Sequence, residues 1–167
     1  GVFRRQRQMC IRDRIRGKFN EPPIDHACLI KIGYAFAKSL FDNEKGQVYI
    51  SHDGRESSYD IELALSIGIK HQGSEVISIG LLPTPALSIC MNMPGLSKGL
   101  YAGIQITASH NPFHDNGVKF FDKNGFKIDS VLEQIIENNY FNQTEEIHVK
   151  DKKNSKSDSI EVFNKRY

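Results

Sequence analysis

Short apolar runs alternate with longer amphipathic segments along much of this chain, and that alternation restricts the fold more than any other sequence feature. The runs Gln47–Ser51, Glu75–Ile79 and Ala102–Thr107 have the length and the β-branched content of buried strands. A helical pattern that ends near Gln72 lies between the first two runs, and a shorter one at Ala86–Met93 precedes the third. A β-α-β-α-β order predicts parallel strands joined by right-handed helical crossovers.

Two helix boundaries are marked by residues with a strong local preference. Asp25 suits the N-cap of the first helix, since its carboxylate can accept hydrogen bonds from the free N–H groups of the first turn. Gly73 suits the end of the second helix, because glycine adopts the left-handed conformation without strain. The first helix then carries apolar residues along one face, at Leu29, Ile32, Phe36 and Leu40.

The region after the third strand predicts that the sheet is not purely parallel. Val118–Phe121 and Phe126–Ile128 are joined through a short Lys-Asn-Gly segment and are typical of a hairpin. Val131–Asn139 has the apolar spacing of a further helix. The sequence therefore predicts an α/β fold with a mixed, mostly parallel sheet flanked by helices, in one domain.

The third strand ends abruptly in a polar elbow, Ala108–Pro112. This segment places the hydroxyl of Ser109 next to the imidazole of His110, and Lys119 follows within an otherwise apolar run. These groups suit chemistry on a dianionic phosphate better than acyl transfer. Adjacent residues of an extended segment point to opposite sides, so Ser109 and His110 do not readily form the hydrogen bond of a serine hydrolase. A turn serine, a solvated histidine and an edge-strand lysine are the alternative interpretations.

The six residues Thr107–Pro112, Thr-Ala-Ser-His-Asn-Pro, resemble the active-site serine loop of the α-D-phosphohexomutases, which reads T/S-A/G-S-H-N-P. Within that superfamily, the continuation Phe113–Phe121 is most similar to the phosphoglucosamine mutase branch. The resemblance extends from about Ile15 to Tyr167. It implies the α/β fold of the first domain of that family.

By this resemblance, Ser109 carries a transferable phosphoryl group as a phosphoserine. The phosphoserine gives the group to a phosphosugar, the hexosamine or hexose bisphosphate intermediate reorients, and the other phosphoryl group returns to the serine. His110 is implied to orient the serine or to stabilise the transferring group. Lys119 is implied to act as a general acid/base or to contact phosphate, and burial would lower the pKa of its ammonium toward an acid/base role.

Arg16 is the fourth residue that the resemblance places at the reacting phosphate. A guanidinium can pair with two phosphate oxygens at once, which gives a physical reason for this role. Arg16 belongs to the segment Arg12–Gly17, which stands where the family has an opening segment resembling F-G-T-D-G-I-R-G. Arg12 and Arg14 replace a Thr and a Gly of that segment, and a surface arginine is the alternative interpretation of Arg16.

Four further residues are expected to support the serine loop. Asp53 and Arg55 match the family segment G-x-D-x-R-x-S, and Arg55 is expected to pair with Asp53 or to buttress the loop. Asn111 is expected to hold the elbow through side-chain hydrogen bonds, while Pro112 fixes its own φ.

The resemblance also implies Mg²⁺ as a cofactor. One oxygen of phosphorylated Ser109 would hold the ion together with carboxylates of a second domain, because Mg²⁺ requires near-octahedral oxygen ligation. The acidic metal loop D-G-D-x-D-R, the sugar-specificity loop and the phosphate-binding loop of the later family domains have no match in these residues. The implied partners are a phosphosugar substrate and the missing C-terminal domains of the same polypeptide. The chain alone is therefore expected to be an inactive fragment of the enzyme.

Composition divides the chain into four expected segments. Residues 1–14 are rich in Arg; they are either a basic arm that contacts nucleic acid or a stretch foreign to the native domain, and the disrupted opening segment favours the second interpretation. Residues 15–142 form the domain with the serine loop. Residues 143–158 are charged, Ser-rich and poor in apolar side chains, as in a surface loop or linker, and residues 159–167 begin the connection to a second domain.

Charge and hydrophobicity narrow the class of protein. Lys and Arg number 22 against 20 Asp and Glu, a net charge of +2, so no nucleic-acid or membrane partner is required. No apolar run approaches the ~20 residues of a membrane span, and no secretory signal pattern is seen. The 3 cysteines show no metal-ligand spacing and are typical of reduced thiols in a cytoplasmic protein.

The expected activity is conversion of glucosamine 6-phosphate to glucosamine 1-phosphate, which would feed UDP-N-acetylglucosamine and peptidoglycan precursor synthesis in a bacterium. A phosphoglucomutase or phosphomannomutase of the same architecture is the first alternative, because the sugar-choosing loop lies outside these residues. The second alternative is a stand-alone α/β domain that binds a partner or a phosphate without turnover.

Overall fold

The computed structural model describes residues 15–93, 99–143 and 147. These residues form a five-stranded sheet and four helices. The strands are β1 (Ile15–Lys18), β2 (Gln47–His52), β3 (Glu75–Leu81), β4 (Tyr101–Ile106) and β5 (Asp115–Phe121), and the helices are α1 (His26–Phe41), α2 (Ser58–Gln72), α3 (Thr84–Met91) and α4 (Ser130–Asn142).

The sheet is mixed, and its strand order is β1-β5-β4-β2-β3. β2 pairs in parallel with both β3 and β4, and these three strands are the ones that the alternating pattern predicts. β5 pairs antiparallel with β4 and with β1. The α/β class and the mixed sheet are therefore confirmed, while β1 is a strand that the local pattern does not predict.

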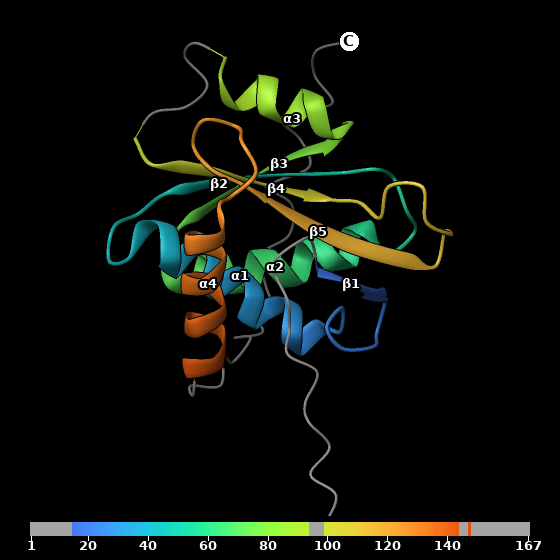
Figure 1. Cartoon of the computed structure of the whole chain (residues 1–167), viewed down its shortest axis with the longest axis horizontal. Coiled ribbons are helices and arrows are strands. Elements are labelled where there is room, and N and C mark those ends of the chain that lie inside the picture. The colour runs from blue at the N-terminus through green and yellow to red at the C-terminus, as the bar shows by residue number, and fades with distance from the viewer. Residues whose placement is uncertain (1–14, 94–98, 144–146, 148–167) are drawn as a thin grey trace, which may run out of the picture.

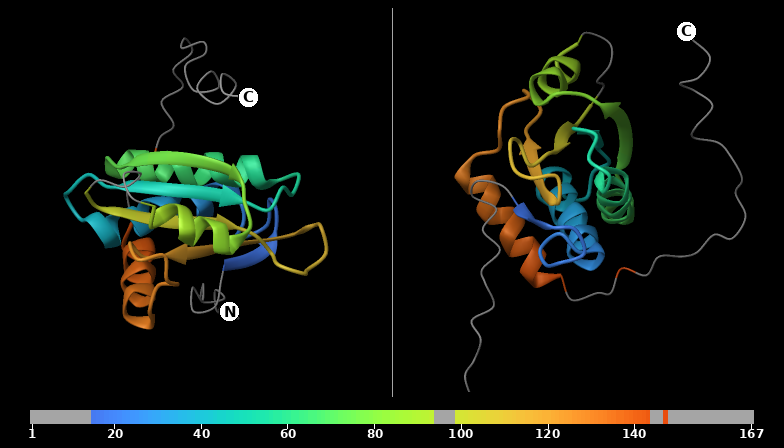
Figure 2. Two further views of the ribbon diagram at one scale, coloured as in Figure 1. Left: turned by 90° about the horizontal axis from the view of Figure 1, so that it is seen from above. Right: turned by 90° about the vertical axis from the view of Figure 1, so that its right-hand side faces the viewer.

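The helices cover the two faces of the sheet unequally. Figure 1 shows α1, α2 and α4 together on one face and α3 alone on the other, and the views of Figure 2 agree. α1 contacts both α2 and α4. Because side chains alternate along a strand, Val48, Ile50 and Ile104 enter the three-helix core while Tyr49 enters a smaller core under α3.

The face that carries α3 changes from apolar to polar toward the carboxyl ends of β2 and β4. Tyr49 of β2 and Phe121 of β5 pack in the core under α3. Two residues away on each of these strands, the register aligns Ser51 of β2, Gln105 of β4 and Lys119 of β5 side by side. The Ser51 hydroxyl donates to Oε1 of the fully buried Gln105 at 2.6 Å. The polar part of this face lies next to the start of the serine loop.

The predicted ends of the first two helices are confirmed. The Asp25 carboxylate accepts a hydrogen bond from the N–H of Cys28 at 2.7 Å and so caps α1. Gly73 adopts a φ of 106° at the end of α2, and its N–H bonds to the carbonyls of Ile69 and Lys70. Local residue preferences therefore decide where α1 begins and where α2 ends.

Two other boundaries differ from the prediction. α3 begins at Thr84 rather than Ala86, because Pro85 is compatible with a first helical turn, whose N–H groups have no acceptor within the helix. β5 begins at Asp115 rather than Val118, because the backbone from 115 to 118 pairs with β1.

The hairpin predicted from Val118–Phe121 and Phe126–Ile128 is confirmed in part. Phe121 and Lys127 form an antiparallel bridge, and the N–H groups of Asp122 and Ile128 donate to the carbonyls of Phe126 (2.8 Å) and Phe120 (3.2 Å). β1 pairs with β5 only from Asp115 to Val118, so the edge of β5 beyond Val118 is open to this returning segment. The returning segment is limited to this single bridge and does not form a regular strand.

Some expectations fall outside the described part of the chain. Residues 1–14 and 159–167 are not described, and of the predicted linker 143–158 only Gln143 and Ile147 are. The segment assignments made there stay predictions. Among the helices that are described, none is long and apolar enough to cross a membrane.

Candidate active site

The serine loop follows β4 directly and presents Ser109 in an unusual backbone conformation. Ser109 has a φ of 59°, in the left-handed region that residues with a side chain seldom adopt. Its N–H donates to Oγ1 of Thr107 at 3.0 Å, and the N–H of Asn111 donates to the carbonyl of Ala108 at 3.2 Å. Ser109 itself is exposed. The loop thus holds an accessible serine hydroxyl on a tight, hydrogen-bonded turn.

Arg55, in the segment between β2 and α2, anchors the backbone of this loop. Its Nε donates to Oδ2 of Asp53 at 3.1 Å. Its two terminal nitrogens donate to four backbone carbonyls of the loop, those of Ser109 (3.1 Å), Asn111 (3.2 Å), Pro112 (2.6 Å) and Asp115 (2.9 Å).

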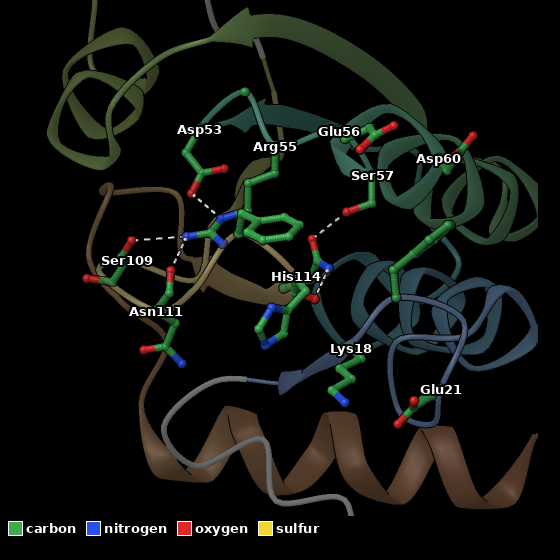
Figure 3. Close-up of a pocket in the computed structure, with 14 residues that line it drawn as sticks. Lys18, Glu21, Asp53, Arg55, Glu56, Ser57, Asp60, Ser109, Asn111 and His114 are labelled. Carbon is green, nitrogen blue, oxygen red and sulfur yellow. Dashed lines mark hydrogen bonds and ion pairs between the residues drawn. The ribbon is translucent and has the colours of Figure 1, made fainter.

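The orientation of Ser109 follows from this anchor. Figure 3 shows its carbonyl oxygen turned toward the Arg55 guanidinium and its hydroxyl turned away from it. A guanidinium has five N–H donors in a rigid plane, so one side chain can hold several carbonyls of the loop together. The anchor therefore fixes the backbone and leaves the hydroxyl free to react.

Arg16 approaches the loop from β1. Its NH1 group donates to Oδ1 of Asn111 at 3.3 Å, and within the described residues its buried Nε has no hydrogen-bond partner. Arg16 lies opposite Gly117 in the β1–β5 register. A Cβ at Gly117 would lie 2.7 Å from the carbonyl oxygen of Thr107 and 3.4 Å from Cγ of Arg16. Glycine is required there so that the loop and the arginine can come together.

Lys119 lies on the same face of the sheet as Arg16. It is half-buried in β5, opposite Gln105 of β4. Residues two apart on a strand share a face, so Lys119 and Gly117 point the same way, and Arg16 lies opposite Gly117. Such diagonal positions are within reach of long side chains. Two cationic side chains are thus neighbours on the polar part of the α3 face.

His110 is not brought into this arrangement. Its side chain is exposed, and no described residue forms a hydrogen bond with its imidazole. The neighbouring Ser109 hydroxyl therefore gains no acceptor from it, as expected for adjacent residues. His110 stays a candidate through its place in the loop motif alone.

A cavity of about 1000 Å³ opens beside the loop, on the side that Arg55 faces. Figure 3 shows that residues from three parts of the chain line it: the turn after β1, the segment that leads from β2 into α2, and the loop between β4 and β5. Of the predicted site residues, Ser109, Asn111, Asp53 and Arg55 line it, whereas Arg16, Lys119 and His110 do not. Its charged lining is mixed, with Lys18, Arg55, Glu21, Asp53, Glu56 and Asp60.

Two contacts of the loop were not expected from the sequence. The Ser57 hydroxyl donates to Oδ1 of Asn116 at 2.6 Å, and Asn116 is only 1% exposed. The carboxylate of Asp115 accepts from Nδ2 of Asn111 at 3.0 Å. Only the second contact has a signal in the sequence: Asn111 and Asp115 are four residues apart across a turn, a spacing that allows a local hydrogen bond between an amide and a carboxylate.

The described residues do not fit a divalent metal ion by themselves. No group of three or more His, Cys, Asp or Glu side chains among them could hold one. The Ser109 hydroxyl supplies a single oxygen, whereas Mg²⁺ takes six oxygen ligands, of which the protein and substrate must supply several.

Comparison with known proteins places the fold and the loop in a family. The family profile described as "Phosphoglucomutase/phosphomannomutase, alpha/beta/alpha domain I" matches residues 8–147. A phosphoglucomutase/phosphomannomutase family protein from Burkholderia thailandensis has a similar structure, with a TM-score of 0.64 and 26% sequence identity over 77% of this chain and 28% of its own.

Curated relatives agree and are more similar in sequence. A phosphoglucosamine mutase from Hamiltonella defensa is 41% identical over 125 residues, and one from Buchnera aphidicola is 42% identical over 125 residues. Each alignment covers 75% of this chain but 27% of the relative, so the chain spans about a quarter of the length of these enzymes. The chain therefore belongs to the phosphohexomutase superfamily, in which it corresponds to the α/β/α domain I of the phosphoglucomutase/phosphomannomutase type.

Proposed function

We propose that this chain is the serine-bearing domain of a mutase that converts glucosamine 6-phosphate to glucosamine 1-phosphate. The observation that carries the proposal is Ser109, an exposed serine in a left-handed conformation whose hydroxyl points away from its backbone anchor. The name of the curated relatives supplies the substrate. The whole activity belongs to a longer polypeptide of the kind those relatives represent.

In this proposal, the phosphoryl group resides on Oγ of Ser109. A sugar hydroxyl attacks phosphorus, the P–Oγ bond breaks, and the proton of the attacking hydroxyl leaves to a base. Lys119 serves as that acid/base group or contacts the phosphate. Oγ of Ser109 takes up a proton as the P–Oγ bond breaks. After the bisphosphate reorients, Oγ gives up that proton and attacks the other phosphorus, the bond between this phosphorus and its sugar oxygen breaks, the sugar oxygen is protonated, and the phosphoserine is restored.

The two cations of the α3 face support this chemistry. Phosphoryl transfer requires positioning and positive charge near the transferring oxygens more than it requires covalent chemistry from the protein. Arg16 is tied to the loop through Asn111, and Lys119 is its diagonal neighbour on the sheet. His110, exposed beside the serine, would contact the transferring group only when substrate is bound.

A phosphoglucomutase or phosphomannomutase activity is the second candidate. The description of the matching family profile and the name of the structural relative favour it. Assays of the same protein with glucose 1-phosphate and mannose 1-phosphate separate the candidates. A larger kcat/KM for either hexose phosphate than for glucosamine 6-phosphate would replace the first proposal by the second.

The test is a Ser109→Ala substitution in the complete product of the source gene. Because the substitution removes the oxygen that carries the phosphoryl group in this proposal, mutase activity should fall by at least about 10³-fold. Ser78→Ala, which removes an exposed hydroxyl from the edge strand β3, is the matched control and should leave activity unchanged.

A second readout is phosphate incorporation. Incubation with a labelled sugar bisphosphate should label the wild-type protein and Ser78→Ala, and should not label Ser109→Ala. Full activity in Ser109→Ala would refute the phosphoserine role. An inactive wild-type product that binds phosphosugars without turnover would favour a binding domain instead.

A further inference from the structure

The side-chain amide of Asn111 lies between two groups of opposite hydrogen-bonding character. On one side, NH1 of Arg16 donates to its Oδ1 at 3.3 Å. On the other side, its Nδ2 donates to Oδ2 of Asp115 at 3.0 Å. Figure 3 shows the backbone carbonyl of Asn111 turned to Arg55 and the amide turned away, so the side chain is free to make this bridge.

This arrangement permits one orientation of the amide. An ionised carboxylate only accepts hydrogen bonds, and a guanidinium only donates them. If the amide turned over, its NH₂ group would face the donors of Arg16, and its oxygen would face the acceptor oxygens of Asp115. Both contacts would be repulsive, so Asp115 forces the Asn111 oxygen toward Arg16.

We propose that Asp115 is a positioning residue of the active site. Its carboxylate orients the Asn111 amide, and the amide oxygen in turn holds the Arg16 guanidinium beside the serine loop. The inference rests on the proposed function, since it assigns Arg16 to the transferring phosphate. It adds a residue that the loop motif Thr107–Pro112 does not include.

The surroundings of Asp115 allow its side chain to be tested separately from the loop backbone. The Asp115 carbonyl accepts from Arg55 at 2.9 Å, and its N–H donates to the carbonyl of Pro112 at 3.0 Å. Neither bond involves the carboxylate, whose other neighbours are the His114 imidazole at 3.7 Å and Lys18 opposite in the strand register. A change of the side chain alone therefore leaves the loop anchored.

Asp115→Asn is the informative substitution. It keeps the shape of the side chain but introduces an NH₂ group, which can donate to the oxygen of a turned amide. Both orientations of Asn111 then find a partner at position 115, so only the donors of Arg16 still favour the observed orientation. Asp115→Glu restores the acceptor on a longer stem and should recover part of the wild-type behaviour.

The first measurement needs no activity and uses the 167-residue chain. In a ¹⁵N NMR spectrum, the Asn111 side-chain NH₂ protons should exchange slowly in the wild type and at least about fivefold faster in Asp115→Asn. Asp42→Asn, which removes an exposed carboxylate at the end of α1, should leave them unchanged. Unprotected Asn111 protons in the wild type would overturn the proposal.

The second measurement is kinetic and uses the complete product of the source gene. Asp115→Asn should lower kcat about tenfold and change KM by less than about threefold, because the constraint acts on the transfer step. In an Asn111→Ala background, Asp115→Asn should have no further effect, since Asp115 acts through that amide. Equal losses in both backgrounds would show a role unrelated to Asn111 and overturn the proposal.

The two measurements separate this inference from the proposed function. An inactive wild-type product with protected Asn111 protons would refute the function and leave the hydrogen-bond bridge standing. An active wild-type product with an equally active Asp115→Asn variant would refute the positioning role and leave the function standing.

Discussion

At the scale of single residues, Arg55 holds the backbone of the serine loop with one side chain. Four loop carbonyls accept from it, and Asp53 neutralises its charge. Its side chain is only 12% exposed, so water has little access to its guanidinium donors.

Arg55→Lys should therefore loosen the loop even though the charge is kept. A lysine has three donors on one nitrogen and cannot span carbonyls that the planar guanidinium reaches together. We expect a loss of about 1–3 kcal/mol in the free energy of unfolding, because hydrogen bonds from a charged group to carbonyls of the loop are lost. Hydrogen exchange at the amides of Asn111 and Asp115, which bond within the loop, should be faster.

Asp53→Asn serves as the graded comparison for this variant. It weakens one contact of Arg55 and leaves the four carbonyl contacts in place. Its effect on loop exchange should be clearly smaller than that of Arg55→Lys. Unaltered exchange at Asn111 and Asp115 in Arg55→Lys would show that the loop holds its conformation without the anchor.

At the scale of elements, α1 and α2 approach each other through two glycines. A Cβ at Gly33 of α1 would collide with the carbonyl of Leu65, and one at Gly68 of α2 would collide with the carbonyl of Ile30 and lie 2.6 Å from the N of Tyr34. These obstacles are backbone atoms, which cannot move aside without displacing a helix. The close packing of the two helices is therefore a direct consequence of these glycines.

Gly68→Ala separates two opposing effects. Helix propensity alone predicts a gain of about 1 kcal/mol, whereas overpacking against the backbone of α1 predicts a loss of about 2 kcal/mol or more. We expect the loss to dominate, seen as a lower urea midpoint with an unchanged m-value. Lys70→Ala, an exposed change in the same helix, should shift the midpoint little. A raised midpoint in Gly68→Ala would show that the helices can separate without penalty.

At the scale of the whole molecule, the contact between α1 and α4 links stability to pH. The Tyr140 hydroxyl donates to Sγ of Cys28 at 3.3 Å. Burial raises the pKa of Cys28 above its ordinary value of 9.0, and burial raises the pKa of Tyr140 above its ordinary value of 10.0. Both groups hold their proton more tightly in the folded protein than in the unfolded chain.

The sign of the pH dependence follows. The stabilisation is fully present below the unfolded-state pKa values and is lost as pH rises past them, because the unfolded chain then releases protons that the folded chain retains. The free energy of unfolding should begin to fall at about pH 8 and should continue to fall above about pH 10. Tyr140→Phe should flatten the upper part of this fall, whereas Tyr59→Phe, at a residue 70% exposed, should not. An identical slope in wild type and Tyr140→Phe would contradict the assignment.

The order of the elements could be predicted from the sequence because it depends on short-range physics. Apolar spacing identifies the strands of the parallel core and the helices between them. Asp25 and Gly73 set helix ends through bonds to residues within a few positions. The serine loop was likewise recognisable, since its motif is contiguous in the chain.

Only the tertiary structure decided how the site is assembled. β1 is a strand because β5 offers it an edge, and this pairing brings Arg16 to Asn111, 95 residues away. Arg55 reaches the loop across 54 to 60 residues. Such contacts depend on which segments the folded sheet places side by side, and no local pattern records them. The sequence by itself determined the parallel strands, the helices and the serine loop, whereas the approach of Arg16 and Arg55 to that loop was decided by long-range packing.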